Sequence, residues 1–353
     1  MSSTISTCII IKNEIENIPD LINDLRQFSD EIIMVDTGST DGTLEWLYEN
    51  QDDVLKLHHY DWIDHFGEAR NYSFSKANKD WIFWCDADDR ISPELIEELI
   101  KLKDKIDELD CTSIFINYLF SEGWDVPRRR LLKRIANPKW HGACHEYVIT
   151  DNDKCLSIDD DKKIIHQRKL THTDRNLNIF IKNILNGIEL STRDYVYYSN
   201  ELRDAGLYEK AYDIALRAIN RDDIWVVDAW NLILYNMTYM WMNNLKPYIE
   251  GINIIDKYEK KGEMRGDIYY VKGLLYKSLN DLENAKESFK KATTYESDQL
   301  LDYGELILNT KIYPAFELYE LVDDGEKVEV VEYLKQYQAI EEVTEFLKKI
   351  GSI

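Results

Sequence analysis

The feature that most constrains this chain is an apolar stretch that ends in three carboxylates, at residues 81–89. Trp81 to Cys85 is short, aromatic and uncharged, which is typical of a strand buried on both faces. If the strand stays extended, Asp86 and Asp88 point to the same side, where they repel each other and need a cation or several hydrogen-bond donors. A divalent metal ion that also takes substrate phosphates satisfies this need. The alternative is a solvated turn before a helix that Ser92 caps.

Apolar and amphipathic segments alternate upstream of this strand. Strands are predicted at residues 7–11, 31–35 and 54–57, and helices at residues 18–28, 43–48 and 66–76. The alternation predicts an α/β domain with a mostly parallel sheet, and ligands of such sheets bind beyond the carboxyl ends of the strands. We therefore expect one crevice to be lined by the polar residues that follow the predicted strands, which are Asn13, Glu14, Asp36 and the carboxylates at 86–89.

A second β-rich part follows a helix predicted at residues 93–109. Its strands are expected at residues 112–118, 128–134 and 163–168, and the middle one, Arg128 to Arg134, is the only concentrated basic run in the chain. We interpret this run as a solvated edge strand that is protected by its charge. The alternative is that about half of its side chains, those on one face, bind a diphosphate or an acceptor.

The sequence from residue 176 to residue 300 shows helical periodicity and an internal repeat. The spacing of six residues fits the tetratricopeptide repeat, a helix–turn–helix unit of about 34 residues: Tyr269, Gly273, Tyr276, Ala285, Phe289 and Ala292. An earlier copy covers residues 195–218, and a degenerate one covers residues 228–261. Residues 301–353 are expected to add amphipathic helices as a cap, with one face made of Val328, Val331, Leu334, Tyr337 and Ile340. The predicted domains are therefore 1–175, 176–300 and 301–353.

Composition narrows the classes of function. The net charge of −23 argues against nucleic acid and anionic lipid as partners, whereas a basic peptide or protein is compatible with it. No apolar run reaches the roughly 18 residues that a membrane span needs. The N-terminus lacks a basic region before its apolar stretch, so no secretory signal is predicted. Five scattered cysteines without metal-ligand spacing favour reduced thiols in the cytoplasm.

Four motifs in the N-terminal half resemble those of family 2 glycosyltransferases with the GT-A fold. In chain order they are Ile9–Glu14, Val35–Thr43, Phe66–Asn71 and Asp80–Asp89. The resemblance covers about residues 5–175, and its fusion to repeats is similar to bacterial enzymes that glycosylate peptides and proteins. It implies an α/β GT-A domain followed by an all-α helical-repeat domain, and an inverting, metal-dependent transfer of a hexose from a UDP-sugar to a Ser, Thr or Cys side chain. A glycan or lipid acceptor is the alternative.

The resemblance also implies roles for residues around the nucleotide. Asp36 would accept a hydrogen bond from the uracil ring. Asn13 or Glu14 would lie near the nucleoside, and Arg70 and Asn71 would border the nucleotide pocket.

The remaining implied roles concern the metal ion and the acceptor. Asp86 and Asp88 would contact ribose and a Mg²⁺ or Mn²⁺ ion, which neutralises the charge of the departing diphosphate. His166 would complete the metal shell, with three other histidines as weaker candidates: His141, His145 and His172. An inverting transfer needs a base for the acceptor proton, and Glu146 is the first candidate. Asp89 competes with it, because the Glu-Asp pair that is frequent in the family is absent here.

Two other classes of function remain as alternatives. The first is a scaffold in which the transferase domain is degenerate and the repeats carry the function, and the intact Asp86–Asp88 pair argues against it. The second is a nucleotidyltransferase or dinucleotide enzyme, which the lack of a Gly-rich loop after the first strand disfavours. A homodimer formed through the helical repeats is a further expectation.

Overall fold

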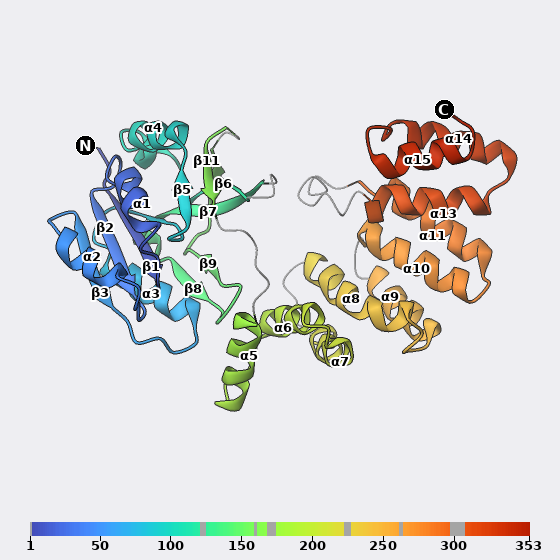
Figure 1. The fold of residues 1–353 in the computed structure, drawn as a ribbon, viewed down its shortest axis with the longest axis horizontal. Helices are drawn as coiled ribbons and strands as arrows, with labels where there is room; N and C mark the ends of the chain where they lie inside the picture. The colour runs from blue at the N-terminus through green and yellow to red at the C-terminus, as the bar shows by residue number, and fades with distance from the viewer. Residues whose placement is uncertain are drawn as a thin grey trace. The chain divides into compact units, whose positions relative to one another are not determined.

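The computed structural model describes residues 2–120, 125–158, 161–167, 174–221, 227–260, 264–296 and 308–353. By its internal contacts the chain divides into two units, Met1–Ile188 and Glu189–Ile353 (Figure 1). The first unit is α/β and the second is helical, in the order that the sequence predicts. Helix α5 (Arg175–Leu185), which the sequence placed at the start of the second domain, lies in the first unit.

The first unit is built on a mixed sheet. Its strands are β1 (Ile5–Ile11), β2 (Glu31–Asp36), β3 (Leu55–His59), β4 (Trp81–Trp84), β5 (Asp89–Ile91), β6 (Ser113–Leu119), β7 (Asp125–Lys133), β10 (Cys155–Ser157) and β11 (Lys163–His166). Within the described residues the order is β3-β2-β1-β4-β7-β6-β11-β5, and β10 also pairs with β6. A separate ribbon pairs β8 (Lys139–His141) with β9 (Tyr147–Ile149).

The first four strands are parallel, as predicted. Ile11 at the end of β1 lies opposite Asp36 at the end of β2, and Cys8 lies opposite Trp84 at the end of β4. The residues that follow these strands therefore emerge at one edge of the sheet. This edge is where the sequence analysis expected the crevice.

The interpretation of residues 128–134 as an edge strand is wrong. Strand β7 pairs antiparallel with β4 on one side and with β6 on the other, so it lies inside the sheet. A β-bulge interrupts its pairing with β6: Ile114 faces Leu131 and Phe115 faces Arg129, which leaves Arg130 as the extra residue. A bulge of this kind redirects a side chain, and Arg130 is buried, with 2% of its side chain exposed.

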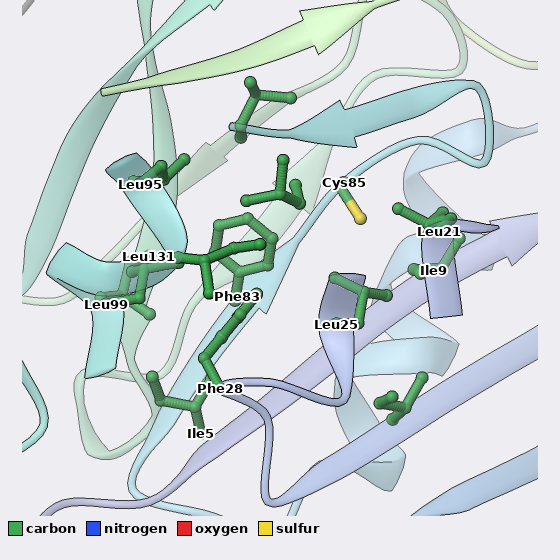
Figure 2. Packing of buried hydrophobic residues seen from close by; sticks show 14 of the residues in the cluster. Ile5, Ile9, Leu21, Leu25, Phe28, Phe83, Cys85, Leu95, Leu99 and Leu131 are labelled. Carbon is green, nitrogen blue, oxygen red and sulfur yellow. The ribbon is translucent and has the colours of Figure 1, made fainter. Parts of the chain in front are cut away.

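Four helices surround the parallel half of the sheet: α1 (Ile18–Leu25), α2 (Thr43–Asn50), α3 (Phe66–Lys76) and α4 (Pro93–Leu102). The Ser92 hydroxyl caps α4 by accepting a hydrogen bond from the Leu95 amide, as the sequence indicates. Leu25 of α1 and Leu99 of α4 belong to the same buried cluster as Phe83 of β4 (Figure 2). The edge of Phe28 also packs on Phe83, with ring centroids 5.3 Å apart. This core fixes β4, and with it the carboxylates that follow.

The second unit is a series of antiparallel helices. They are α6 (Thr192–Asp204), α7 (Tyr208–Ile219), α8 (Val227–Met242), α9 (Tyr248–Glu259), α10 (Gly266–Ser278), α11 (Leu282–Thr294), a π-turn (Leu308–Ile312), α13 (Tyr313–Leu321), α14 (Asp324–Lys335) and α15 (Glu341–Lys349). The predicted repeat is the pair α10–α11, where a Cβ on Gly273 would lie 2.4 Å from the Phe289 ring. The predicted cap face is wrong at one position, because Val328 is 63% exposed and Val330 is buried in its place. No helix in the described parts of the chain has the length and apolarity to cross a membrane.

Candidate active site

The predicted crevice exists at the carboxyl edge of the parallel strands. It is a cavity of about 460 Å³ lined by Lys12, Asn13, Glu14, Asn17, Asp88 and Gln167. Three of the predicted site residues therefore meet in it, which are Asn13, Glu14 and Asp88. The other predicted site residues are not among those that line this cavity.

The loops that follow β1 and β2 are tied together at one side of the site. Asp36 is buried and accepts hydrogen bonds from the amides of Gly38 at 2.9 Å and Ser39 at 3.2 Å. Asn13, in a left-handed conformation with φ of 59°, accepts a hydrogen bond from the Thr40 amide at 2.7 Å. The backbone amide of Asn13 donates to the Ser39 hydroxyl at 2.9 Å. These local bonds hold both loops in the shape that forms the rim.

Glu14 is held by two short contacts beside the same rim. Its amide donates to the Thr43 hydroxyl at 2.8 Å, and its carboxylate accepts a hydrogen bond from the Asn17 side chain at 2.7 Å. The carboxylate therefore lines the cavity and adds negative charge near Asp88.

The acidic segment after β4 turns instead of continuing as a strand. The Asp89 amide donates to the Asp86 carbonyl at 3.1 Å, and the Asp86 amide donates to the Asp89 carboxylate at 2.8 Å. The expectation that Asp86 and Asp88 share one face of an extended strand is therefore wrong. The turn sends Asp86 toward two arginines and Asp88 toward a histidine.

Asp86 lies among positive charges. Arg70 donates to it at 2.7 Å, and the Arg130 guanidinium is 3.9 Å away. Arg130 also lies 3.7 Å from Asp89, and its guanidinium carbon is 3.8 Å from the centroid of the Trp84 ring. Burial alone would raise the pKa of Asp86, but Arg70 and Arg130 lower it to about 2. Asp86 is therefore ionised and well compensated.

Asp88, Asp89 and His166 form a second group, and Asp88 has less positive charge beside it than Asp86 has. One ligand atom from each lies within 4.8 Å of the others. His166 Nδ1 is 3.6 Å from Asp88 and 3.3 Å from Asp89. Burial and the repulsion of Asp86 raise the pKa of Asp88 to about 6. For His166, burial lowers the pKa, but the hydrogen bond to Asp89 and the charge of Asp88 outweigh it and the pKa is raised.

Asp89 is part of the interior and is not placed to meet an acceptor. Its side chain has no exposed surface, and it accepts a hydrogen bond from the Tyr118 hydroxyl at 2.7 Å. The same hydroxyl lies 2.7 Å from His166 Nδ1, and the backbone pairs His166 with Asp89 across β11 and β5. The competing assignment of Asp89 as the base thus meets a physical obstacle, because a base needs hydrogen-bond reach to its substrate.

Arg70 and Asn71 bind the segment that carries Glu146. Arg70 Nε donates to Glu146 at 2.7 Å, and its guanidinium carbon lies 4.7 Å from the Trp84 ring and 4.9 Å from the Trp140 ring. Both polar atoms of the Asn71 side chain bond the main chain of Trp140, at 3.0 and 2.8 Å. The amide group of Asn71 thus faces the ribbon, and its expected place at the border of the nucleotide pocket stays a prediction.

The other described candidate histidines, His141 and His145, are not part of the Asp88–Asp89–His166 group. His141 stacks on Tyr147 in the β8–β9 ribbon, with ring centroids 5.5 Å apart. His145 has a left-handed φ of 48° in the loop of that ribbon, and His172 lies outside the described residues. The sequence analysis did not single out Arg130, Tyr118 or Trp140. Arg130 was inside the noted basic run, but its burial depends on a bulge that has no clear sequence signal.

Comparison with known proteins identifies the first unit. Residues 6–153 match the model of the family described as glycosyl transferase family 2. The chain carries a family 2 glycosyl transferase domain. Residues 266–299 match the tetratricopeptide repeat, which confirms the repeat predicted at α10–α11. The matched residues contain the site described above except for His166 and Gln167, which lie beyond them.

Two relatives and one solved structure are similar to parts of this chain. A TPR repeat-containing protein of Synechococcus elongatus is 31% identical over 157 residues, which is 44% of this chain and 37% of that protein. The SPbeta prophage-derived glycosyltransferase SunS of Bacillus subtilis is 24% identical over 83% of this chain and 72% of its own length. Among solved structures, S. aureus TarS 1-349 in complex with UDP-GlcNAc aligns over 84% of this chain and 94% of that chain, at 16% identity and a TM-score of 0.42.

Proposed function

We propose that this glycosyltransferase moves a hexose from a UDP-sugar to a peptide or protein side chain, with inversion and with a divalent metal ion. The observation that carries the proposal is the cavity at the carboxyl edge of the parallel strands, which is lined by Asn13, Glu14 and Asp88. Asp36 remains the candidate for the uracil ring, because a carboxylate has more acceptor sites than the two that Gly38 and Ser39 use.

The residues that would hold the metal ion are Asp88, Asp89 and His166. Their spacing allows one ion to contact all three, and carboxylate and imidazole are suitable ligands for Mn²⁺. Burial, together with the negative charge of Asp86, raises the pKa of Asp88 to about 6, and a bound cation would compensate that charge. When bound, the ion would neutralise charge on the departing diphosphate. Asp86 was also expected to contact the metal, but its pairing with Arg70 and Arg130 supports a role beside the ion instead.

Glu146 is our candidate for the group that takes the proton from the acceptor. Its carboxylate is held by Arg70, which also contacts Asp86, so one guanidinium connects Glu146 with the acidic segment after β4. A carboxylate can accept the proton that the acceptor hydroxyl or thiol loses during transfer. Asp89 is disfavoured because it is fully buried.

A peptide or protein acceptor is supported by the second unit and by charge. Stacked helical repeats offer extended surfaces that bind peptides. A net charge of −23 would attract a basic segment. The five cysteines are free thiols, which supports a reducing compartment such as the cytoplasm. Mass spectrometry of basic Ser-, Thr- and Cys-containing peptides after incubation with donor tests the acceptor class, and sedimentation of the full chain tests the expected homodimer.

The donor site is tested by titration calorimetry with UDP and Mn²⁺. We expect wild-type protein to bind UDP, and both EDTA and Asp88→Asn to weaken binding by about tenfold or more. Asp153→Asn is the matched control, because Asp153 is a partly exposed aspartate of the same domain that pairs with Arg129. Absence of UDP binding, or binding that is indifferent to Asp88→Asn, would overturn the proposal.

A further inference from the structure

Helix α3 is fastened to the segment 139–146 along one side of its first turns. The amide of Phe66 donates to the Ala143 carbonyl at 2.9 Å, and that of Gly67 donates to the Gly142 carbonyl at 3.3 Å. One turn later Arg70 holds Glu146, and Asn71 holds the main chain at Trp140. Four residues of α3 at helical spacing thus bind one segment that is distant in sequence.

The approach between the helix and this segment is close. A Cβ on Gly67 would lie 2.6 Å from the Gly142 carbonyl oxygen, which is a backbone atom and cannot move aside by rotating a side chain. Gly142 itself has φ of 94°, a conformation that favours glycine. The segment therefore turns back toward the helix, and this turn brings Glu146 to Arg70.

Arg70 bridges two carboxylates that belong to different parts of the site. Its Nε and one terminal nitrogen lie 2.7 Å from Glu146 and Asp86 respectively. The rings of Trp84 and Trp140 lie on its guanidinium, and 9% of its side chain is exposed. A planar fork can hold two carboxylates at fixed angles, which the point charge of a lysine cannot do.

We propose that Arg70 is a positioning residue that fixes the Glu146 carboxylate relative to Asp86 and the donor site. The inference rests on the proposed function, in which Glu146 receives the acceptor proton. In this proposal, the motif Phe66–Asn71 holds the segment that carries Glu146, and the loops after β1 and β2 bind the nucleotide. A base displaced by about 1 Å loses much of its effect. Loss of the Arg70 contacts to Glu146 and Asp86 should therefore lower the rate of sugar transfer.

The test uses the full chain with UDP and Mn²⁺ for binding, and nucleotide release without acceptor for turnover. The donor for turnover is whichever of UDP-glucose, UDP-galactose and UDP-N-acetylglucosamine wild-type protein hydrolyses fastest. We expect Arg70→Lys to keep the Kd for UDP within about threefold and to lower kcat by about 30- to 100-fold. Combined with Glu146→Gln it should cause no further loss, because both changes remove the same function.

Two more variants separate positioning from folding. Gly67→Ala keeps every charge but displaces Gly142, so we expect it to lower kcat with UDP binding retained. Arg129→Lys replaces a neighbouring ion-paired arginine outside the site and should leave kcat unchanged. An unchanged kcat in Arg70→Lys, or fully additive losses in the double variant, would overturn the inference while the proposed function stands. Wild-type protein that neither binds UDP nor hydrolyses a donor would overturn both.

Discussion

Replacing Arg130 by methionine should destabilise the glycosyltransferase domain by about 3–5 kcal/mol at neutral pH. Methionine has a similar volume but no charge, so the change removes one positive charge from beside two carboxylates, of which Asp89 is fully buried. Asp89, which has no exposed surface, loses a guanidinium 3.7 Å away, and Asp86 loses one at 3.9 Å. Breaking a buried pair by removing one partner costs more than the pair itself contributes, because the remaining charge stays desolvated.

The remaining contacts decide where the loss falls in this range. Asp86 keeps Arg70, and Asp89 keeps the Tyr118 hydroxyl, which limits the penalty. Against this, the Arg130 guanidinium lies 3.8 Å from the Trp84 ring and 4.4 Å from the Tyr118 ring. Cation–π contacts of desolvated groups contribute about 2 kcal/mol. We therefore expect a loss near the middle of the range.

Hydrogen exchange of the full chain in increasing urea is the suitable assay, because peptides from β4 and β7 report on this domain even if the helical unit unfolds separately. Arg129→Met is the control, since Arg129 is the next residue of β7 but pairs with Asp153, whose side chain is 41% exposed. The control should cost less than about 1 kcal/mol. Equal losses for Arg129→Met and Arg130→Met, or a loss below about 1 kcal/mol for Arg130→Met, would refute the reasoning.

Three further changes test other parts of the structure. Gly273→Ala should destabilise the α10–α11 pair by about 1–3 kcal/mol in thermal unfolding, because its Cβ would overlap the Phe289 ring, and Phe289→Leu should restore part of the loss. Ser92→Ala should cost about 1 kcal/mol in urea unfolding through the lost helix cap. Hydrogen bonds from Thr4 lower the pKa of Asp80. The stabilisation that they give is therefore present above about pH 4 and is lost as pH falls through the lowered pKa. Thr4→Val should raise the pKa of Asp80, which carboxyl ¹³C NMR measures.

Local pattern predicted the scaffold of the glycosyltransferase domain well. The helix predicted at residues 66–76 has these bounds in the structure, because its start and end are set by neighbouring residues: His65 caps it, and Ala77 is extended. The parallel strands and the edge where they end follow from alternation of elements, which is also local information. The repeat at α10–α11 follows from spacing, and the contact of Gly273 with Phe289 gives that spacing its physical reason.

Local sequence patterns did not predict the contacts between segments that are far apart in the chain. Residues 128–134 look like an exposed strand because arginine is costly to bury, and only the bulge opposite Ile114 and Phe115 directs Arg130 inward, where two carboxylates compensate it. Asp86 and Asp88 separate because hydrogen bonds between Asp86 and Asp89 close a turn, which the strand-like residues before it do not indicate.

Arg70 and Arg130 also explain why Asp86 and Asp88 are proposed to have different roles. Asp86 takes the positive charge of Arg70 and Arg130, and its pKa of about 2 shows that this charge is sufficient. Among the described residues, Asp88 has no arginine partner of this kind. Burial raises its pKa, as do the charges of Asp86, Asp89 and Glu14, and His166 acts to lower it. A cation entering the site gains most where compensation is weakest. In the proposed function, the metal ion would therefore be held at Asp88 and His166, and Asp86 would connect the donor site with Glu146 through Arg70.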